Sequence, residues 1–391
     1  MREGYTLWQI AAMRLMQVAL AIALSTGTAF AGDAKPRELI DDAKALLVVG
    51  ACAEGSPPES VDAKILEAHC KKIKQAQDDY RAKWLDVADK WFATNVPKDA
   101  PKAVVYPFAG GDLSTALTVY PDAEEITTLS LEPAGDPRAL AKLDNKELRQ
   151  ALRVVEKELS SLYRADFSVT MNMITAMRRG ELPTQLIFGL SALAIHGYEL
   201  TSMRYFHLTK DGDIKYLTDE DFAAIDKISD VGKRNKELSN VEIKFHKKGS
   251  TKEQTYRHIM ANLDDKHIKA DPSALAHLEK KGTVAGMTKA ASYLLTFHDF
   301  STMRKYIIDH VDWMVSDSTG LPPKYGKPAG FEYETWGTYE ASNMKAGAEV
   351  TPQWRALYRE QEKRPLAFRF GYPDKKLHGH LIIMRRAPKK T

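Results

Sequence analysis

Two acidic residues follow short apolar runs in the first third of the chain, where they could help to bind a ligand. The run 103–106 leads into Pro107-Phe108-Ala109-Gly110-Gly111-Asp112, and Glu132 ends the run 126–131. Adjacent glycines let the backbone approach a ligand, and the start of a following helix favours an anion. A carboxylate after the second strand is where an open α/β fold binds a ribose hydroxyl. The same residues also suit a tight turn in which Asp112 caps a helix.

A second pair of carboxylates lies near the ends of later apolar runs. Asp299 follows the run 293–297, which we expect to be a strand, and Asp317 follows the run 312–316. The carboxyl ends of parallel strands open onto one edge, so both would join Asp112 and Glu132 there. Such a cluster could hold a divalent metal through oxygen ligands, or act as a general acid and base. Alternatively, Asp299 caps the next helix and Asp317 shapes the turn into Gly320.

Aromatic and histidine residues near the C-terminus supply two further candidates. The stretch 325–339 is broken by proline and glycine, which predicts a long ordered loop. Its Trp336 and Tyr339 could stack on a sugar ring, or could fill a small core. His378 and His380 would point the same way on a strand, which can suit a metal, but no third ligand with a clear spacing accompanies them. No G-x-S-x-G, Walker or H-E-x-x-H motif is present.

The elements that must position these residues have an α/β pattern. Strand, glycine turn, helix and strand follow one another over 103–131, which makes a βαβ unit with parallel pairing. We expect a Rossmann-like, mostly parallel sheet over residues 101–391, with β-hairpins inserted at about 196–262. One hairpin would turn at Asp211-Gly212. Residues 32–100 have the spacing of amphipathic helices and predict a helical N-terminal section.

The first 31 residues have the pattern of a secretory signal peptide. Arg14 precedes the apolar run 15–24, and Ala29-Phe30-Ala31 matches a cleavage site. The apolar run is too short for a bilayer, which needs ~20 residues, although an amphipathic or membrane helix is the alternative. Met13 directly precedes Arg14 and is a second possible start. We therefore expect a periplasmic or secreted protein with no transmembrane segment once the leader is removed.

The cysteines and the charge agree with such an address. The chain has two cysteines, Cys52 and Cys70, and an even count in an exported protein favours one disulfide. Two buried thiols are the alternative. The 56 basic and 52 acidic side chains give a formal net charge of +4, which is spread along the chain. This mild excess does not indicate a nucleic-acid partner.

Two resemblances follow from these motifs. The segment from 103 to Glu132 resembles the cofactor half of class I methyltransferases, which implies a nucleoside cofactor such as S-adenosylmethionine. Between about residues 100 and 375 the chain also resembles a family of exported bacterial proteins with no assigned activity. The segments that carry this second resemblance are 106–112, 131–135, 289–295, 317–322 and 370–372. It implies a fold and an address but no reaction.

The expectation that unites these observations is an exported protein whose strand-end crevice binds a small or glycan-like ligand. Gly110, Gly111, Trp336 and Tyr339 would contact that ligand. One alternative is a hydrolase that uses Asp112, Glu132, Asp299 and Asp317 around a water or a metal. Another is a methyltransferase that stays in, or returns to, the cytoplasm, where nucleotide cofactors are found. The sequence identifies no cofactor and does not settle whether the protein is an enzyme.

Overall fold

The computed structural model describes residues 34–165, 182–341, 344–372 and 379–387. The chain divides into two units, Met1–Pro36 and Arg37–Thr391, and the helices and strands named below belong to the second. Within the described ranges, no helix combines the length and the apolar character needed to cross a membrane.

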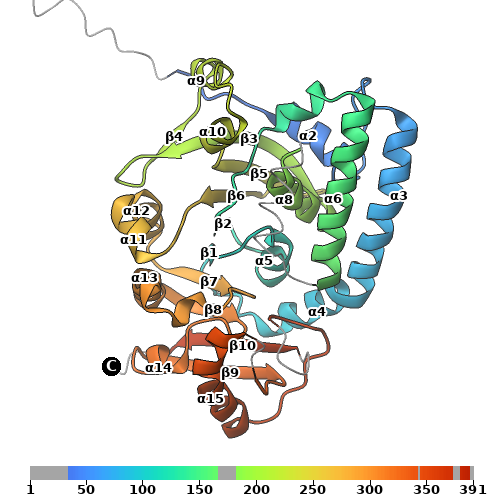
Figure 1. Cartoon of the computed structure of the whole chain (residues 1–391). Helices are drawn as coiled ribbons and strands as arrows, with labels where there is room; N and C mark the ends of the chain where they lie inside the picture. Colours follow the sequence, from blue (N-terminus) through green and yellow to red (C-terminus); the bar gives the residue numbers. More distant parts are fainter. Residues whose placement is uncertain (1–33, 166–181, 342–343, 373–378, 388–391) are drawn as a thin grey trace, which may run out of the picture. The chain divides into compact units, whose positions relative to one another are not determined.

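Ten strands form one mixed sheet (Figure 1). Their order across the sheet is β4-β3-β5-β6-β2-β1-β7-β8-β10-β9. The strands are β1 (Ala103–Pro107), β2 (Glu125–Ser130), β3 (Tyr198–Leu208), β4 (Ile214–Tyr216), β5 (Val241–Lys247), β6 (Glu253–Met260), β7 (Val284–Thr288), β8 (Val311–Ser316), β9 (Phe331–Gly337) and β10 (His380–Arg386).

The centre of this sheet is parallel. Strands β6, β2, β1, β7 and β8 are neighbours that run in the same direction, and antiparallel strands flank them on both sides. Side chains of β1 alternate between two cores, with Val104 and Tyr106 in one and Val105 in the other. Both faces of a strand in a parallel sheet are buried, which explains its continuous apolar run. The predicted Rossmann-like α/β fold is confirmed.

Helices cover both faces (Figure 1). One core is shared with α2 (Ile40–Val49), α3 (Ala63–Tyr80), α4 (Asp86–Asn95), α5 (Leu113–Val119), α6 (Asn145–Ala165), α8 (Thr184–Ile195) and α9 (Asp219–Ile225). The other core is shared with α11 (Asp265–Ala270), α12 (Ser273–Glu279), α13 (Ser301–His310) and α15 (Lys345–Glu360). The remaining α-helices are α10 (Val231–Glu237) and α14 (Pro323–Gly326). A π-helical turn, Arg81–Leu85, joins α3 to α4, and short 3₁₀ turns form at Pro137–Lys142, Leu294–Thr296 and His298–Phe300.

Three segments differ from the sequence expectations. The predicted hairpins exist, but β6 pairs in parallel with β2, so this segment extends the main sheet and is not set apart from it. Residues Phe331–Gly337 form strand β9: alternate side chains from Phe331 to Thr335 are buried, the strand contains no proline, and its one glycine is the last residue. The run 293–297 forms a 3₁₀ turn because Tyr293 has a positive φ of 60°, which a strand cannot accommodate.

The predicted disulfide is confirmed. It joins Cys52, which follows α2, to Cys70 in the middle of α3, with 5.3 Å between the two Cα atoms. Closing a loop of this length stabilises a fold by ~3 kcal/mol through the entropy of the unfolded chain. The bond therefore holds the segment between α2 and α3 against α3.

Candidate functional site

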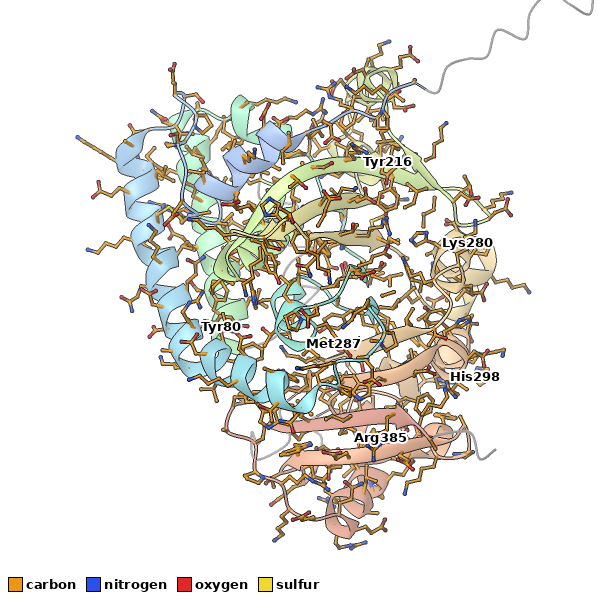
Figure 2. All side chains as sticks on the ribbon, turned by 180° about the vertical axis from the view of Figure 1, so that it is seen from behind. Tyr80, Tyr216, Lys280, Met287, His298 and Arg385 are labelled. Atoms are coloured by element: carbon orange, nitrogen blue, oxygen red, sulfur yellow. A yellow bond between two sulfur atoms is a disulfide. The ribbon has the colours of Figure 1, made fainter. Side chains whose placement is uncertain are left out.

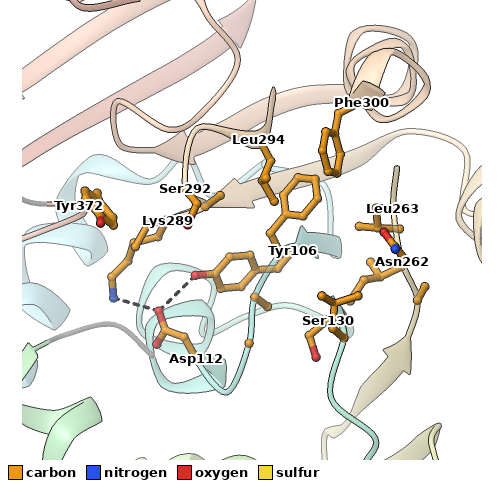
Figure 3. Close-up of a pocket in the computed structure, with 18 residues that line it drawn as sticks. Tyr106, Asp112, Ser130, Asn262, Leu263, Lys289, Ser292, Leu294, Phe300 and Tyr372 are labelled. Atoms are coloured by element: carbon orange, nitrogen blue, oxygen red, sulfur yellow. Dashed lines mark hydrogen bonds and ion pairs between the residues drawn. The ribbon is translucent and has the colours of Figure 1, made fainter. Parts of the chain in front are cut away.

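A cavity of about 350 Å³ opens at the carboxyl ends of β1, β2 and β7 (Figure 3). Strand β1 leads through α5 to β2 on one side, whereas β7 pairs with β1 on the other side. The order of strands reverses at this point, and open α/β folds bind their ligands in the crevice that results. Residues after these strands line the cavity, among them Phe108, Leu131, Ser292 and Phe300, and Asn262 after β6 lines it as well. We call this cavity the crevice.

A buried ion pair lies at the inner end of the crevice (Figure 3). The Lys289 ammonium, directly after β7, is 2.9 Å from an Asp112 carboxylate oxygen, and the Tyr106 hydroxyl donates to the same carboxylate at 3.2 Å. Asp112 also caps α5, accepting from the Thr115 amide at 3.2 Å. The indole ring of Trp84 lies 5.4 Å from the Lys289 ammonium. Opposite charge and an aromatic face thus offset the cost of burying this lysine.

The loops around the crevice contain unusual backbone. Phe108, Ala290, Ser292 and Tyr293 have positive φ values of 60°, 53°, 50° and 60° although none is glycine. In the part of the chain that the structure describes, Cys52 is the one other non-glycine residue with positive φ. Each such residue costs on the order of 1–3 kcal/mol and persists when its surroundings hold it. Strain of this kind clusters at functional sites, which favours the crevice as the site.

The carboxylate of Asp317 holds the strained loop 290–293 in place through a hydrogen bond to its backbone. One of its carboxylate oxygens accepts from the Ala290 amide at 3.0 Å and from the Tyr372 amide. The other oxygen accepts from the Thr319 amide at 2.8 Å and from the Thr319 hydroxyl. Gly371 has a φ of +80°, and a Cβ there would overlap Asp317. Asp317 is therefore a positioning residue, whose carboxylate supports the crevice without lining it.

The Tyr372 ring lines the crevice beside this clamp. Burial and the neighbouring Asp317 carboxylate raise the pKa of the Tyr372 phenol, so the hydroxyl stays protonated at neutral pH. A protonated phenol can donate one hydrogen bond as well as accept. Asp317, which follows β8, thus holds the backbone of Tyr372, and the Tyr372 phenol adds a polar group to the crevice wall.

Glu132 lies immediately after Leu131, a crevice residue, and its carboxylate is fully buried. Neither carboxylate oxygen has a hydrogen-bond partner in the described part of the chain. The backbone carbonyl of Glu132 accepts from His258 Nε2 at 2.7 Å. Burial lowers the pKa of His258 to about 4, so the ring is neutral and its Nδ1 is an acceptor.

Gln185 of α8 contacts both the glycine turn and His258. Its amide nitrogen donates to the Gly110 carbonyl at 2.8 Å and to His258 Nδ1 at 3.3 Å. Both amide hydrogens are then used, and the amide oxygen, which is also buried, has no partner among the described residues. Two acceptor groups, from Glu132 and Gln185, are therefore left without donors next to the glycine turn.

The other residues predicted from sequence lie in different surroundings. Gly111 does not line the crevice, and a Cβ there would overlap the Phe188 ring, so packing against α8 explains this glycine. The Asp299 side chain is 84% exposed and is not a lining residue. Trp336 packs edge-to-face on Trp91, with ring centres 4.9 Å apart. Tyr339 is buried against His380.

One member of the histidine pair, His380, lies in the part of the chain that the structure describes. His380 is buried and its Nε2 lies 2.9 Å from the Ser318 hydroxyl. His378 lies outside the described residues. Across the described ranges, no group of three or more His, Cys, Asp or Glu side chains could hold a metal ion.

Sequence reasoning missed Lys289, the strained loop 290–293 and Gln185. A lysine directly after the apolar run 284–288 was the available signal for Lys289, because that run is strand β7. Gln185 gave no signal, since its role depends on α8 packing beneath the glycine turn.

Comparisons with family models, curated proteins and solved structures returned no match to this chain.

Proposed function

We propose that the crevice binds a small ligand with a hydroxylated ring, of nucleoside or glycoside type. The observation that carries this proposal is the strained, clamped loop 290–293 beside a cavity at the strand-order reversal. A fold retains backbone strain at several neighbouring residues where a precise wall shape is needed. A volume of about 350 Å³ is within the range of small-molecule sites.

The chemistry of the walls supports this class of ligand. Leu131, which is 48% exposed, and Leu263 and Phe300 offer apolar surfaces to the face of a ring. Ser292 and Asn262 add hydroxyl and amide groups at the same rim. A ligand hydroxyl that reaches past Leu131 would donate to the carboxylate of Glu132.

Titration calorimetry of the purified protein with a ligand panel tests the proposal. The panel holds S-adenosylmethionine, NAD, adenosine, 2′,3′-dideoxyadenosine and N-acetylglucosamine oligomers. At least one hydroxylated ligand should bind and raise the melting temperature, because a ligand at 100 times its Kd stabilises by ~2.7 kcal/mol. The dideoxy compound is the matched control without the diol. The absence of binding across the panel, or equal binding of adenosine and its dideoxy analogue, would overturn the proposal.

A methyltransferase is the second candidate. The glycine turn after β1 and the carboxylate after β2 resemble the cofactor half of that class. Gly110 of the turn lines the crevice, and Glu132 directly follows the lining residue Leu131. S-adenosylmethionine should then bind more tightly than the other members of the panel, and S-adenosylhomocysteine should compete with it. The hydrolase alternative draws less support, because Asp112 pairs with Lys289 and the oxygens of Asp317 accept from protein donors.

We also propose that residues 1–31 direct export and are removed. The disulfide is compatible with an oxidising compartment. Cell fractionation with N-terminal sequencing should find a mature protein that begins at Gly32. A full-length product in the cytoplasm would contradict export, and it would favour the methyltransferase candidate.

A further inference from the structure

The crevice has a polar end and an apolar end (Figure 3). Asp112, Lys289 and Tyr372 lie toward one end, and Leu263 and Phe300 lie toward the other. The two charged lining residues, Asp112 and Lys289, pair with each other at 2.9 Å. A ligand that fills the whole crevice would therefore meet polar groups with one part and carbon with the other.

Several apolar side chains of the lining keep contact with solvent. Among the described residues, the large ones are Phe108, Leu131, Leu294 and Phe300. They come from loops after different strands, and the rings of Phe108 and Phe300 meet edge-to-face with their centres 5.6 Å apart. Apolar surface that remains in water is surface that a ligand can cover with a gain in free energy. We call these four side chains the apolar mouth.

The apolar surface continues beyond the lining. Leu131 is 48% exposed, Phe297 is 42% exposed and Val231 of α10 is 58% exposed, and these three are the exposed large apolar side chains of the described ranges. The Phe297 carbonyl accepts from the Phe300 amide at 3.3 Å, so its backbone lies next to the mouth. His298, the next residue, is labelled at the surface in Figure 2 and its side chain is 98% exposed. Two of the three exposed residues thus belong to the region of the mouth.

The polar side chain at this end is engaged within its own loop. Asn262 accepts from the Asp264 amide at 3.3 Å, and its amide nitrogen lies 3.0 Å from His267 Nδ1. None of the four side chains of the mouth is charged. Contact with carbon is therefore the main interaction that the mouth can offer.

We propose that the ligand of the crevice carries an alkyl or acyl chain, which leaves through the apolar mouth. This inference rests on the proposed function for the hydroxylated head and on the mouth for the chain. The head would occupy the polar end, and the chain would cover Leu131 and Phe300. The ligand is then an amphiphile, such as an alkyl glycoside or an acylated nucleoside. Each methylene that leaves water for the mouth should raise the affinity roughly two- to fourfold.

Titration calorimetry with two series of probes tests the inference, with every probe kept below its micelle concentration. The first series, 1-butanol, 1-hexanol and 1-octanol, has the chain without a head. The second compares methyl with octyl β-glucoside, and adenosine with its 5′-octanoyl ester. Affinity should rise about tenfold or more from butanol to octanol, and each chain-bearing head should bind about tenfold or more tightly than its partner.

Two serine substitutions locate the effect. Leu131→Ser should weaken octanol binding about three- to tenfold, because it removes apolar surface from the mouth. Val231→Ser is the matched control, since it removes an equally exposed apolar side chain from a helix that has no buried residue. This control should leave octanol binding unchanged. Both side chains are exposed, so both variants should keep the melting temperature of the wild type.

Three outcomes would overturn the inference. They are an affinity that does not rise with chain length, an equal loss of octanol binding in Val231→Ser, and a dimer in analytical ultracentrifugation that Leu131→Ser removes. In the last case a second copy of the chain would cover the mouth.

The two series also separate this inference from the proposed function. Heads that bind without any gain from the chain would contradict the inference and leave the proposed function in place. Alcohols that bind more tightly with chain length, while no head binds, would support the mouth and contradict the proposed function.

Discussion

Strand β2 carries a glutamate near each end, and the two have opposite surroundings. At the amino end, Glu125 forms ion pairs with Arg257 and Lys281. These cations hold the pKa of Glu125 at about 2, although burial acts in the opposite direction. Just past the carboxyl end, Glu132 is fully buried and neither of its oxygens has a partner in the described chain.

We infer from this difference that the amino end of the sheet serves stability and that the carboxyl end serves the proposed ligand site. A buried charge is tolerated when it is paired, as at Glu125, and otherwise reduces stability. Proteins retain such unfavourable groups where activity needs them. The crevice, with its strained loop, lies at the end where the carboxylate is unpaired. The same substitution at the two positions should therefore have opposite effects.

The largest effect is expected for Glu125→Gln. Removing the shared carboxylate of these partly buried ion pairs leaves Arg257 and Lys281 with less opposing charge, and the free energy of unfolding should fall by about 3 kcal/mol. Urea denaturation of the variant and the wild type measures the difference. A change below ~0.5 kcal/mol, which is typical of surface sites, would mean that the amino-end pairing does not stabilise the sheet.

Asp317→Asn should lower the free energy of unfolding by about 2 kcal/mol. An amide nitrogen would face backbone N–H donors that now bind a carboxylate, including those of Ala290 and Tyr372. Affinity for the crevice ligand should fall as well, because the loop loses its clamp. Asp299→Asn is the matched control, since its exposed side chain should change neither quantity. Equal effects at the two positions would contradict the role of Asp317 in holding the loop.

Acid should weaken the amino end selectively. The folded pKa of Glu125 lies below its ordinary value of 4.5, so its contribution is complete above that pH and is lost as the pH falls toward about 2. In this window the free energy of unfolding of the wild type should fall by up to about 1.4 kcal/mol per pH unit more than that of Glu125→Gln. Parallel pH profiles for the two proteins would show that the ion pairs have no net effect.

Glu132→Gln should give the smallest change in stability, with the opposite sign. Replacing an unpartnered buried carboxylate by a neutral amide of similar shape should raise the free energy of unfolding by about 1 kcal/mol. Binding of the crevice ligand should weaken tenfold or more, because a ligand hydroxyl loses its charged acceptor. Thermal unfolding and calorimetry on one preparation measure both. A loss of stability with unchanged binding would make Glu132 a structural residue.

Local signals in the sequence were enough for part of this architecture. The apolar run before Gly110 and the run before Glu132 each match one buried strand, because a parallel strand is apolar on both faces. The pairing of Cys52 with Cys70 followed from there being two cysteines. The proline and glycine residues of 325–339 predicted a loop. Pairing with β10 instead makes Phe331–Gly337 the strand β9.

What the sequence determined by itself was therefore the class of fold and the edge of the sheet at which polar residues would gather, since both depend on local periodicity. Only the tertiary structure decided which of those residues share a cavity. Lys289 meets Asp112 across 177 positions of the chain, and Gln185 lies 75 positions from the glycine turn that it supports. Contacts of that separation depend on how helices pack on the sheet, which no short stretch of sequence encodes.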